Sequence, residues 1–367
     1  MSPKRALKWA AAAIPLALLL VLLVAYWRSD NACGEPRATA PRVPMKAVIY
    51  CDYGGPEVLR IENVEKPVPN DDEVLVRVRA VAVNPLDWHF MRGTPYLGRM
   101  EMGLRRPKST RLGVDFAGTV EAVGRNVTRF KPGDAVFGGR NGAFAEYVVV
   151  RADRNVVLEP TNATFEQAAA IPIAGVTALQ AVRDQGGVRA GQTVLVNGAS
   201  GGVGTFAVQI AKSLGANVTG VSSTKNVDMV RSIGAARVID YTHDDFTRDP
   251  ERYDVVIDNV GNHSLSDLRH VMKTGGRYVM VGGPPGRWVD PLPRAASTYL
   301  YSKLTGQDMR FFLAALNPKD LTVLRDLVQA GKVTPVIDRR YPFGELPEAI
   351  RYLETGRARG KVVVTME

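Results

Sequence analysis

The chain has 367 residues, enough for two domains, and its composition is that of an ordinary globular protein. Hydrophobic residues make up 46% and charged residues 23%, which argues against a disordered or fibrous chain. The formal net charge is +10, but the sequence has no basic stripe interleaved with aromatic residues, so we expect no nucleic-acid partner. Two cysteines, Cys33 and Cys51, could pair but cannot build a disulfide framework or a four-cysteine zinc site.

The first predicted element is a hydrophobic helix close to the N-terminus. The run from Trp9 to Trp27 is uncharged, and as a helix it would span about 28 Å, close to the hydrocarbon thickness of a bilayer. We therefore expect residues 1–44 to form a transmembrane anchor and a tether. A cleaved signal peptide and a misassigned start, with Met45 opening the next domain, are the alternatives.

Residues 45–165 are predicted to form a β-rich domain. Apolar or alternating runs are broken by Gly, Pro and Asn, which is typical of short strands joined by turns. The runs are MKAVIYC, EVLVRVRAVAV, DFAGTVEAVG and AFAEYVVV. This pattern favours a partly closed β-barrel over a parallel sheet.

Residues 166–312 follow a different pattern, in which strands and helices alternate. Thr164 and Gln167 form a capping box that begins a helical region. Strands are then predicted at TVLVN, NVTGVS, ARVID, YDVVIDNV and RYVMVGG, with helices between them. This alternation predicts a doubly wound parallel sheet.

Residues 313–367 contain two amphipathic helical patterns and a last strand, KVVVTM. We expect that strand to return to the β-rich domain. The parallel sheet would then be inserted between two parts of that domain, and ligands would bind in the cleft between the two.

The strongest chemical signal is a glycine-rich loop after the strand TVLVN. Strand, loop and helix stand in the order of a dinucleotide-binding motif. A glycine at position 201 lets backbone amides approach a pyrophosphate at the helix N-terminus, and Gly204 lets helix and strand pack closely. The residues expected to contact the cofactor here are Ser200, Gly201, Gly202, Val203 and Gly204.

The end of the next strand discriminates between the two nicotinamide cofactors. An NAD site carries an acid there that binds the ribose 2′-hydroxyl. This chain has Ser222, Ser223 and Lys225 instead, whose hydroxyls and ammonium group suit a 2′-phosphate. We therefore expect NADPH to be preferred over NADH.

With these motifs, the chain from Met45 to Glu367 resembles the medium-chain dehydrogenase/reductase superfamily. It is most similar to the quinone reductase and zeta-crystallin branch, including reticulon-interacting-protein-like members. The motifs are MKAVIYCDYGGPEVL, AVNPLDWHFMRG, GVDFAGTVEAVG, PGDAVFG, AAAIPIAGVTALQA, NGASGGVGTFAVQIAK, VIDYT and GKVVV. The resemblance implies an α/β fold in which a Rossmann doubly wound parallel sheet is inserted in a GroES-like β-barrel domain, with the hydrophobic helix added at the N-terminus.

The resemblance also implies hydride transfer from NADPH to a quinone or an α,β-unsaturated carbonyl. Zinc-dependent members have a catalytic Cys where this chain has Asn84, and Gly-His-Glu where it has Gly113, Val114 and Asp115. The four histidines are scattered singly, so we expect no metal. Since members of this family commonly pair through the sheet of the cofactor domain, the resemblance suggests a homodimer.

The resemblance assigns the remaining site residues. Asn84, Asp87 and His89 would lie near the nicotinamide, with Tyr53 at the entrance. Asn84 would orient the substrate and His89 could donate a proton, although a turn-forming Asn84 and a structural His89 are the alternatives. Cofactor contacts are carried over to Thr177 near the nicotinamide-side phosphate, to Ser222, Ser223, Lys225 and Tyr241 around the 2′-phosphate, and to Asn259 and Gly282 at the nicotinamide end.

Two other functions fit the same sequence. One is a zinc-free alcohol dehydrogenase or carbonyl reductase, and the other is a membrane-tethered, NADPH-binding regulatory protein without turnover. The charges on either side of the hydrophobic run do not determine its orientation. The need for NADPH favours a catalytic body on the cytoplasmic side of the membrane.

Overall fold

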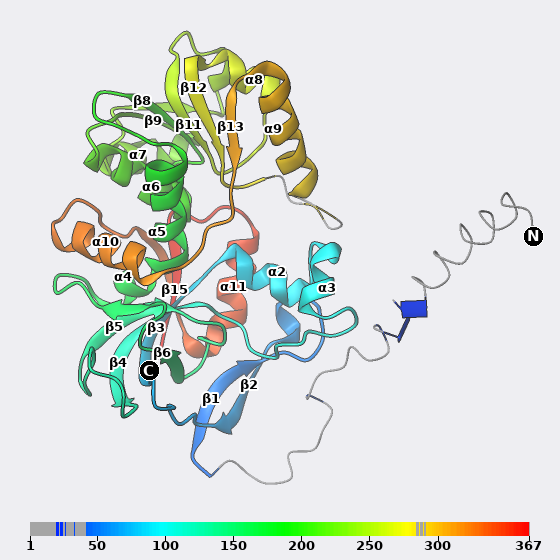
Figure 1. Cartoon of the computed structure of the whole chain (residues 1–367), viewed down its shortest axis with the longest axis vertical. Coiled ribbons are helices and arrows are strands. Elements are labelled where there is room, and N and C mark those ends of the chain that lie inside the picture. Colours follow the sequence, from blue (N-terminus) through cyan, green and yellow to red (C-terminus); the bar gives the residue numbers. More distant parts are fainter. Residues whose placement is uncertain are drawn as a thin grey trace, which may run out of the picture.

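The computed structural model describes residues 20, 21, 23, 24, 26, 33, 42–283, 286, 289 and 291–366. Two lobes are visible, one built on a parallel sheet with helices and the other on mainly antiparallel strands (Figure 1). Because the chain leaves the antiparallel lobe, builds the parallel one and then returns, strands from both ends of the sequence meet in one sheet.

In the antiparallel lobe, β1 (Pro44–Ile49) pairs with β2 (Arg60–Glu65). The larger sheet has the order β14-β15-β3-β4-β5-β7, with β6 also paired to β3. Strand β3 lies inside this sheet, between β15 and β4. It is apolar and buried along most of its length, as expected for a strand that is covered on both sides. The bounds are β3 Glu73–Val83, β4 Asp115–Val123, β5 Ala135–Gly139, β6 Tyr147–Arg151, β7 Val156–Leu158, β14 Ile337–Pro342 and β15 Lys361–Thr365.

The parallel lobe contains a sheet of order β10-β9-β8-β11-β12-β13, in which all neighbours run parallel. The strand order reverses between β8 and β11, and in such sheets dinucleotides bind at the carboxyl ends of the strands at this switch point. The bounds are β8 Thr193–Asn197, β9 Asn217–Ser222, β10 Arg237–Asp240, β11 Tyr253–Asp258, β12 Met272–Met280 and β13 Asp308–Phe311. The predicted doubly wound parallel sheet is confirmed.

Helices cover both lobes. Their bounds are α2 Pro85–Arg92, α3 Arg99–Met102, α4 Phe165–Ala169, α5 Pro172–Leu179, α6 Gly202–Ser213, α7 Val227–Ser232, α8 Leu265–His270, α9 Leu292–Thr305, α10 Pro318–Gln329 and α11 Leu346–Glu354. The predicted capping box is present, since Thr164 Oγ1 accepts from the Gln167 amide and Gln167 Oε1 accepts from the Thr164 amide. At Asn84, for which a turn was the alternative to a role in the site, the chain begins helix α2, which Asn84 caps and which ends at Gly93 with a left-handed φ of 60°.

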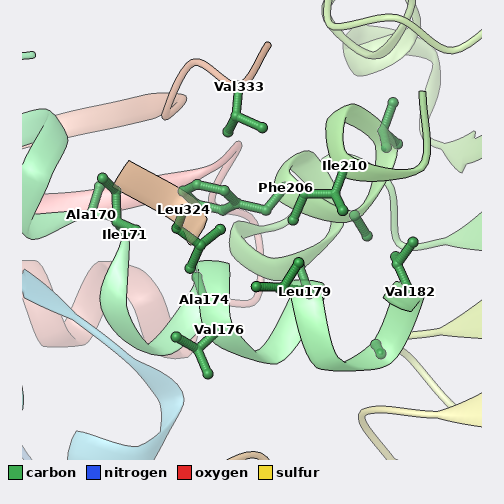
Figure 2. Close-up of a cluster of buried hydrophobic side chains, with 14 of the residues drawn as sticks. Ala170, Ile171, Ala174, Val176, Leu179, Val182, Phe206, Ile210, Leu324 and Val333 are labelled. Atoms are coloured by element: carbon green, nitrogen blue, oxygen red, sulfur yellow. The ribbon is translucent and has the colours of Figure 1, made fainter. Parts of the chain in front are cut away.

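A continuous apolar core joins the two lobes. It combines Ala82 of β3, residues of α5 and α6, and strand residues of the parallel sheet. Figure 2 shows Phe206 of α6 and Leu324 of α10 packed against side chains of α5. The last strand, β15, pairs antiparallel with β3, as expected. The two lobes are therefore held together by buried apolar contacts as well as by the chain segments that connect them.

The predicted transmembrane anchor at Trp9–Trp27 requires correction. Most of that run lies outside the described residues, and among the residues that are described no helix is long and apolar enough to cross a membrane. The membrane-anchored location and the membrane partner expected from the sequence are therefore not supported. Cys33 and Cys51, whose pairing the sequence left open, form a disulfide with their Cα atoms 5.6 Å apart.

Candidate active site

The glycine-rich loop joins β8 to α6 at the switch point of the parallel sheet. Gly201 is the N-cap of α6, and the first amides of a helix have no partner within it, so they face whatever lies before the helix. A Cβ built on Gly201 would meet no atom closer than 3.5 Å, whereas one on Gly204 would lie 2.0 Å from the carbonyl oxygen of Gly198. The loop therefore leaves open space at Gly201 and packs tightly at Gly204.

The carboxyl end of β9 carries the residues expected around a 2′-phosphate. Ser222 is buried, Lys225 is exposed and Tyr241 is 62% exposed. A residue that the sequence did not indicate, Asn226, links this end to the glycine-rich loop: its Nδ2 donates to Ser200 Oγ at 3.1 Å and to Ser223 Oγ at 3.2 Å. Both serine oxygens are thus used as acceptors, so each hydroxyl hydrogen can be donated elsewhere.

The carboxyl ends of β8 and β11 are joined by a buried hydrogen-bond network. Asp258 accepts from Asn197 Nδ2, from the backbone amides of residues 260 and 261, and from the hydroxyl of Tyr278. Asn259 Nδ2 donates to the carbonyl oxygen of Asn197, while its Oδ1 is buried without a partner among the described residues. A Cβ on Gly282 would lie 2.2 Å from the carbonyl oxygen of Asn259, so a glycine is required there.

A buried polar cluster of three side chains lies between the lobes. Asn84 Nδ2 donates to Asp115 Oδ2 at 2.9 Å, and Lys361 Nζ donates to Asn84 Oδ1 and lies 3.4 Å from Asp115 Oδ2. The other oxygen of Asp115 accepts from the Ile173 amide at the start of α5. Asn84 Nδ2 also donates to the Ala82 carbonyl oxygen, so both the nitrogen and the oxygen of the Asn84 side-chain amide are already hydrogen-bonded to neighbouring protein groups. It therefore holds its neighbours in position and has no donor left for a substrate.

This cluster is in contact with the glycine-rich loop. A Cβ on Gly202 would lie 3.2 Å from Lys361 Cδ, and the Gly360 amide donates to the Ser200 carbonyl oxygen. The aliphatic part of the Lys361 side chain thus runs past the N-terminus of α6. The last strand therefore brings the dinucleotide loop and the Asn84 cluster together, although they are distant in sequence.

A cavity of about 210 Å³ adjoins the cluster in the antiparallel lobe. Asp87, on the first turn of α2, is fully buried and lines it. Burial raises the pKa of Tyr50, another lining residue, well above its ordinary value. The lining residues are Tyr50, Asp87, Phe90, Glu101, Met102, Lys108, Ser109, Arg111, Leu112, Gly113, Val114 and Asn141.

The other sequence-predicted site residues occupy less central positions. His89 Nδ1 bonds the Thr94 carbonyl oxygen at 2.9 Å and its ring stacks on Trp88, and His89 is not among the residues lining this cavity. The Tyr53 hydroxyl donates to the Gly103 carbonyl oxygen and so holds the loop that contains α3. The Thr177 hydroxyl donates to the Ile173 carbonyl oxygen one turn earlier in α5.

The residues present fit a dinucleotide. Gly201 leaves room at a helix N-terminus for an anionic group, and at the carboxyl end of β11, beside Gly282, Asn259 has a buried oxygen that no described residue contacts by a hydrogen bond. Within the described part of the chain, no three His, Cys, Asp or Glu side chains are grouped so that they could hold a metal ion.

Comparison with known proteins identifies the class. Residues 70–161 match the alcohol dehydrogenase GroES-like domain, and residues 233–364 match the family described as zinc-binding dehydrogenase. The chain is 36% identical to 2-methylene-furan-3-one reductase of Solanum lycopersicum, over 92% of this chain and 83% of that protein. It is 33% identical to the mitochondrial NAD(P)H oxidoreductase RTN4IP1 of Homo sapiens, over 94% and 96%.

Among solved structures, the quinone oxidoreductase of Coxiella burnetii superimposes with a TM-score of 0.77 at 29% identity, over 89% of this chain and all of that one. The chain belongs to the medium-chain dehydrogenase/reductase superfamily, and its relatives are consistent with the quinone oxidoreductase branch. It is an oxidoreductase that uses a nicotinamide cofactor.

Three residues with a place in the site were missed at the sequence level. Lys361 lies in an apolar strand motif, GKVVV, where a lone lysine is an uncommon residue to bury, and that was the available signal. No such signal marks Tyr50 or Asn226, because residues at an apolar strand end or a polar helix start do not reveal which cavity or loop they will face.

Proposed function

We propose that this chain transfers hydride from NADPH to an α,β-unsaturated carbonyl or a quinone, without zinc. The observation that carries the proposal is the contact, along β15, between a dinucleotide loop and a buried polar cluster that adjoins a mostly apolar cavity. The α,β-unsaturated carbonyl and quinone reductases among the relatives support this substrate class, since NADPH-dependent alkenal/one oxidoreductase of Arabidopsis thaliana is 35% identical over 87% of the chain.

The preference for NADPH is supported by the chemistry at the end of β9. No acid lies at the end of this strand to bind a ribose 2′-hydroxyl, and Lys225 offers an exposed ammonium. Asn226 holds the oxygens of Ser200 and Ser223, which directs both hydroxyl hydrogens away from itself. Hydroxyl and ammonium donors suit a dianionic phosphate and suit a neutral hydroxyl much less.

Independence from zinc is supported by what surrounds Asn84. An ammonium group, that of Lys361, already lies between the Asn84 amide and the Asp115 carboxylate. When bound, the reduced nicotinamide supplies hydride. The chain's own residues would bind its phosphates at α6 and β9, hold its nicotinamide end near Asn259, and contact the substrate through both the apolar and the polar side chains of the cavity.

The test is to incubate the purified full-length chain with NADPH, NADH, and panels of enones, quinones and simple ketones. We expect oxidation of NADPH that requires an enone or a quinone and that is slower with NADH. Binding of NADPH without oxidation across all panels would refute the enzymatic proposal, and reduction of the simple ketones alone would favour a carbonyl reductase. Stoichiometric zinc in the purified protein would refute zinc independence.

A further inference from the structure

Asp87 is an unusual group in this cavity, because only one oxygen of its buried carboxyl is hydrogen-bonded within the described part of the chain. Its side chain is fully buried, and Oδ2 accepts the backbone amide of Asn84 at 2.7 Å. Oδ1 has no hydrogen-bond partner among the described residues. A buried carboxylate oxygen without a donor is costly, whereas a protonated oxygen that can donate to a ligand in the cavity avoids this cost.

Burial is the main reason why Asp87 favours the protonated form. Burial and the negative charge of Asp115 raise its pKa, the nearby backbone amides of Asn84 and Gly113 and the charge of Lys361 lower it, and the net result is a pKa of about 7. The other titratable groups that line the same cavity are Tyr50, Glu101, Lys108 and Arg111. At neutral pH a large share of the molecules therefore carries a proton at the wall of the cavity.

His89, the other acid that the sequence suggested, has no proton available for a ligand in this cavity. Since a carbonyl oxygen only accepts hydrogen bonds, the contact with the Thr94 carbonyl puts the hydrogen of the neutral ring on Nδ1, and Nε2 then has none to give. A spare proton is present only in the imidazolium form, and burial lowers the pKa of His89 below its ordinary value. The ring also does not line the cavity in which Asp87 lies.

We propose that Asp87 is the acid that protonates the substrate in this cavity, an inference that rests on the function proposed above. Hydride from the reduced nicotinamide adds to the β-carbon of an α,β-unsaturated carbonyl, and the carbon–carbon π electrons move toward the carbonyl to give an enolate. The α-carbon of the enolate takes the proton from Asp87, which becomes a carboxylate. A proton from water then restores the acid, so the product gains one hydride and one proton in all.

The test is Asp87→Asn, because an asparagine keeps an oxygen that can accept the Asn84 amide but has no acidic proton. In the wild-type chain kcat/KM should fall as the pH rises through about 7, since the protonated acid is the active form. Asp87→Asn should lower kcat/KM about 100-fold, the usual size of an acid–base contribution, and should abolish that fall with pH. NADP+ affinity should stay unchanged.

His89→Asn is the matched control, since its amide nitrogen can still donate to the Thr94 carbonyl oxygen. It should keep the wild-type pH profile, and loss of the profile in this variant would overturn the proposal even if Asp87→Asn failed to fold. A pH profile that survives in Asp87→Asn would overturn it too. Failure of the wild-type chain to reduce any enone would instead defeat the proposed function itself.

Thermal stability gives a readout that needs no substrate. Because the folded-state pKa of Asp87 lies above its ordinary value, the native state binds the extra proton, and this contribution to stability is lost as the pH rises toward about 7. The Tm of Asp87→Asn relative to that of the wild type should therefore increase between pH 5 and pH 8. A constant difference would show that Asp87 does not hold a proton in the folded protein.

Discussion

Two neighbouring glycines of the cofactor loop should respond to the same substitution in opposite ways. Gly201→Ala puts its Cβ into open space, 3.5 Å from the nearest atom, at a φ of −80° that alanine adopts freely. Gly204→Ala puts its Cβ 2.0 Å from the Gly198 carbonyl oxygen, roughly 1.3 Å closer than an ordinary C···O contact of about 3.3 Å. Only the second substitution forces helix α6 away from β8.

The magnitudes follow from this geometry. Overpacking of this kind costs about 1–3 kcal/mol, and at roughly 2–4 °C per kcal/mol the Tm of Gly204→Ala should fall by several degrees. Gly201→Ala should change the free energy of unfolding by less than about 0.5 kcal/mol. Its methyl group would occupy the space through which a pyrophosphate reaches the first amides of α6. The loss of one hydrogen bond to a charged group, about 1.5–3 kcal/mol, lowers affinity roughly 10–100-fold.

Thermal unfolding and titration of NADPH fluorescence measure the two effects separately. We expect Gly201→Ala to unfold at the same temperature as the wild type and to bind NADPH more weakly. We expect Gly204→Ala to unfold at a lower temperature than the wild type. Wild-type affinity in Gly201→Ala would refute the placement of the pyrophosphate, and wild-type stability in Gly204→Ala would refute the packing between α6 and β8.

Two further substitutions test the ends of the site. Lys225→Met should weaken NADPH about 10-fold or more and NADH little, because only NADPH carries the 2′-phosphate; equal weakening, or the same effect in the exposed control Lys319→Met, would contradict this assignment. Lys361→Met should lower the free energy of unfolding by about 3–5 kcal/mol in chemical denaturation, since it leaves the buried Asp115 charge without its partner. The double variant Lys361→Met/Asp115→Asn should regain part of that loss, and no regain would argue against the pairing.

The strands and the cofactor loop could be predicted because their signals are local. A run such as TVLVN followed by glycines and a helix specifies a strand, a turn and a packing distance within a few residues. Helix α9 and strand β13 were not predicted, because neither carries a local signal of this kind. Tyr299, Leu300 and Leu304 of α9 are exposed, so no apolar stripe marks that helix, and β13 is a short edge strand with two charged residues.

The arrangement of the site depends on contacts between residues far apart in sequence. Asn84 and Lys361 meet only because β15 pairs with β3, and the capping position of Asn84 brings Asp87 to the wall of the cavity. The resemblance pointed to Asn84, Asp87 and His89 together, but it could not say which of the three lines the cavity and has a side-chain polar atom without a partner among the described residues. That distinction needed the hydrogen bonds of Thr94 and of the Asn84 amide.

The hydrophobic run at Trp9–Trp27 illustrates a limit of a different kind. Length and hydropathy predicted a membrane helix, yet no helix among the described residues is long and apolar enough for that role. The oxidoreductase chemistry does not depend on the run, since the loop, the cluster and the cavity all lie between Tyr50 and Lys361.

The central claim is that hydride moves from NADPH to a carbon–carbon double bond, and isotopic labelling tests it most directly. The full-length chain is given NADPH that carries deuterium at the reactive C4 position, together with an enone that it reduces, and the product is examined by NMR and mass spectrometry. Our account predicts one deuterium on the β-carbon, a solvent hydrogen on the α-carbon and an intact carbonyl group. Deuterium on the carbonyl carbon of an alcohol product, or no transfer of deuterium at all, would contradict it.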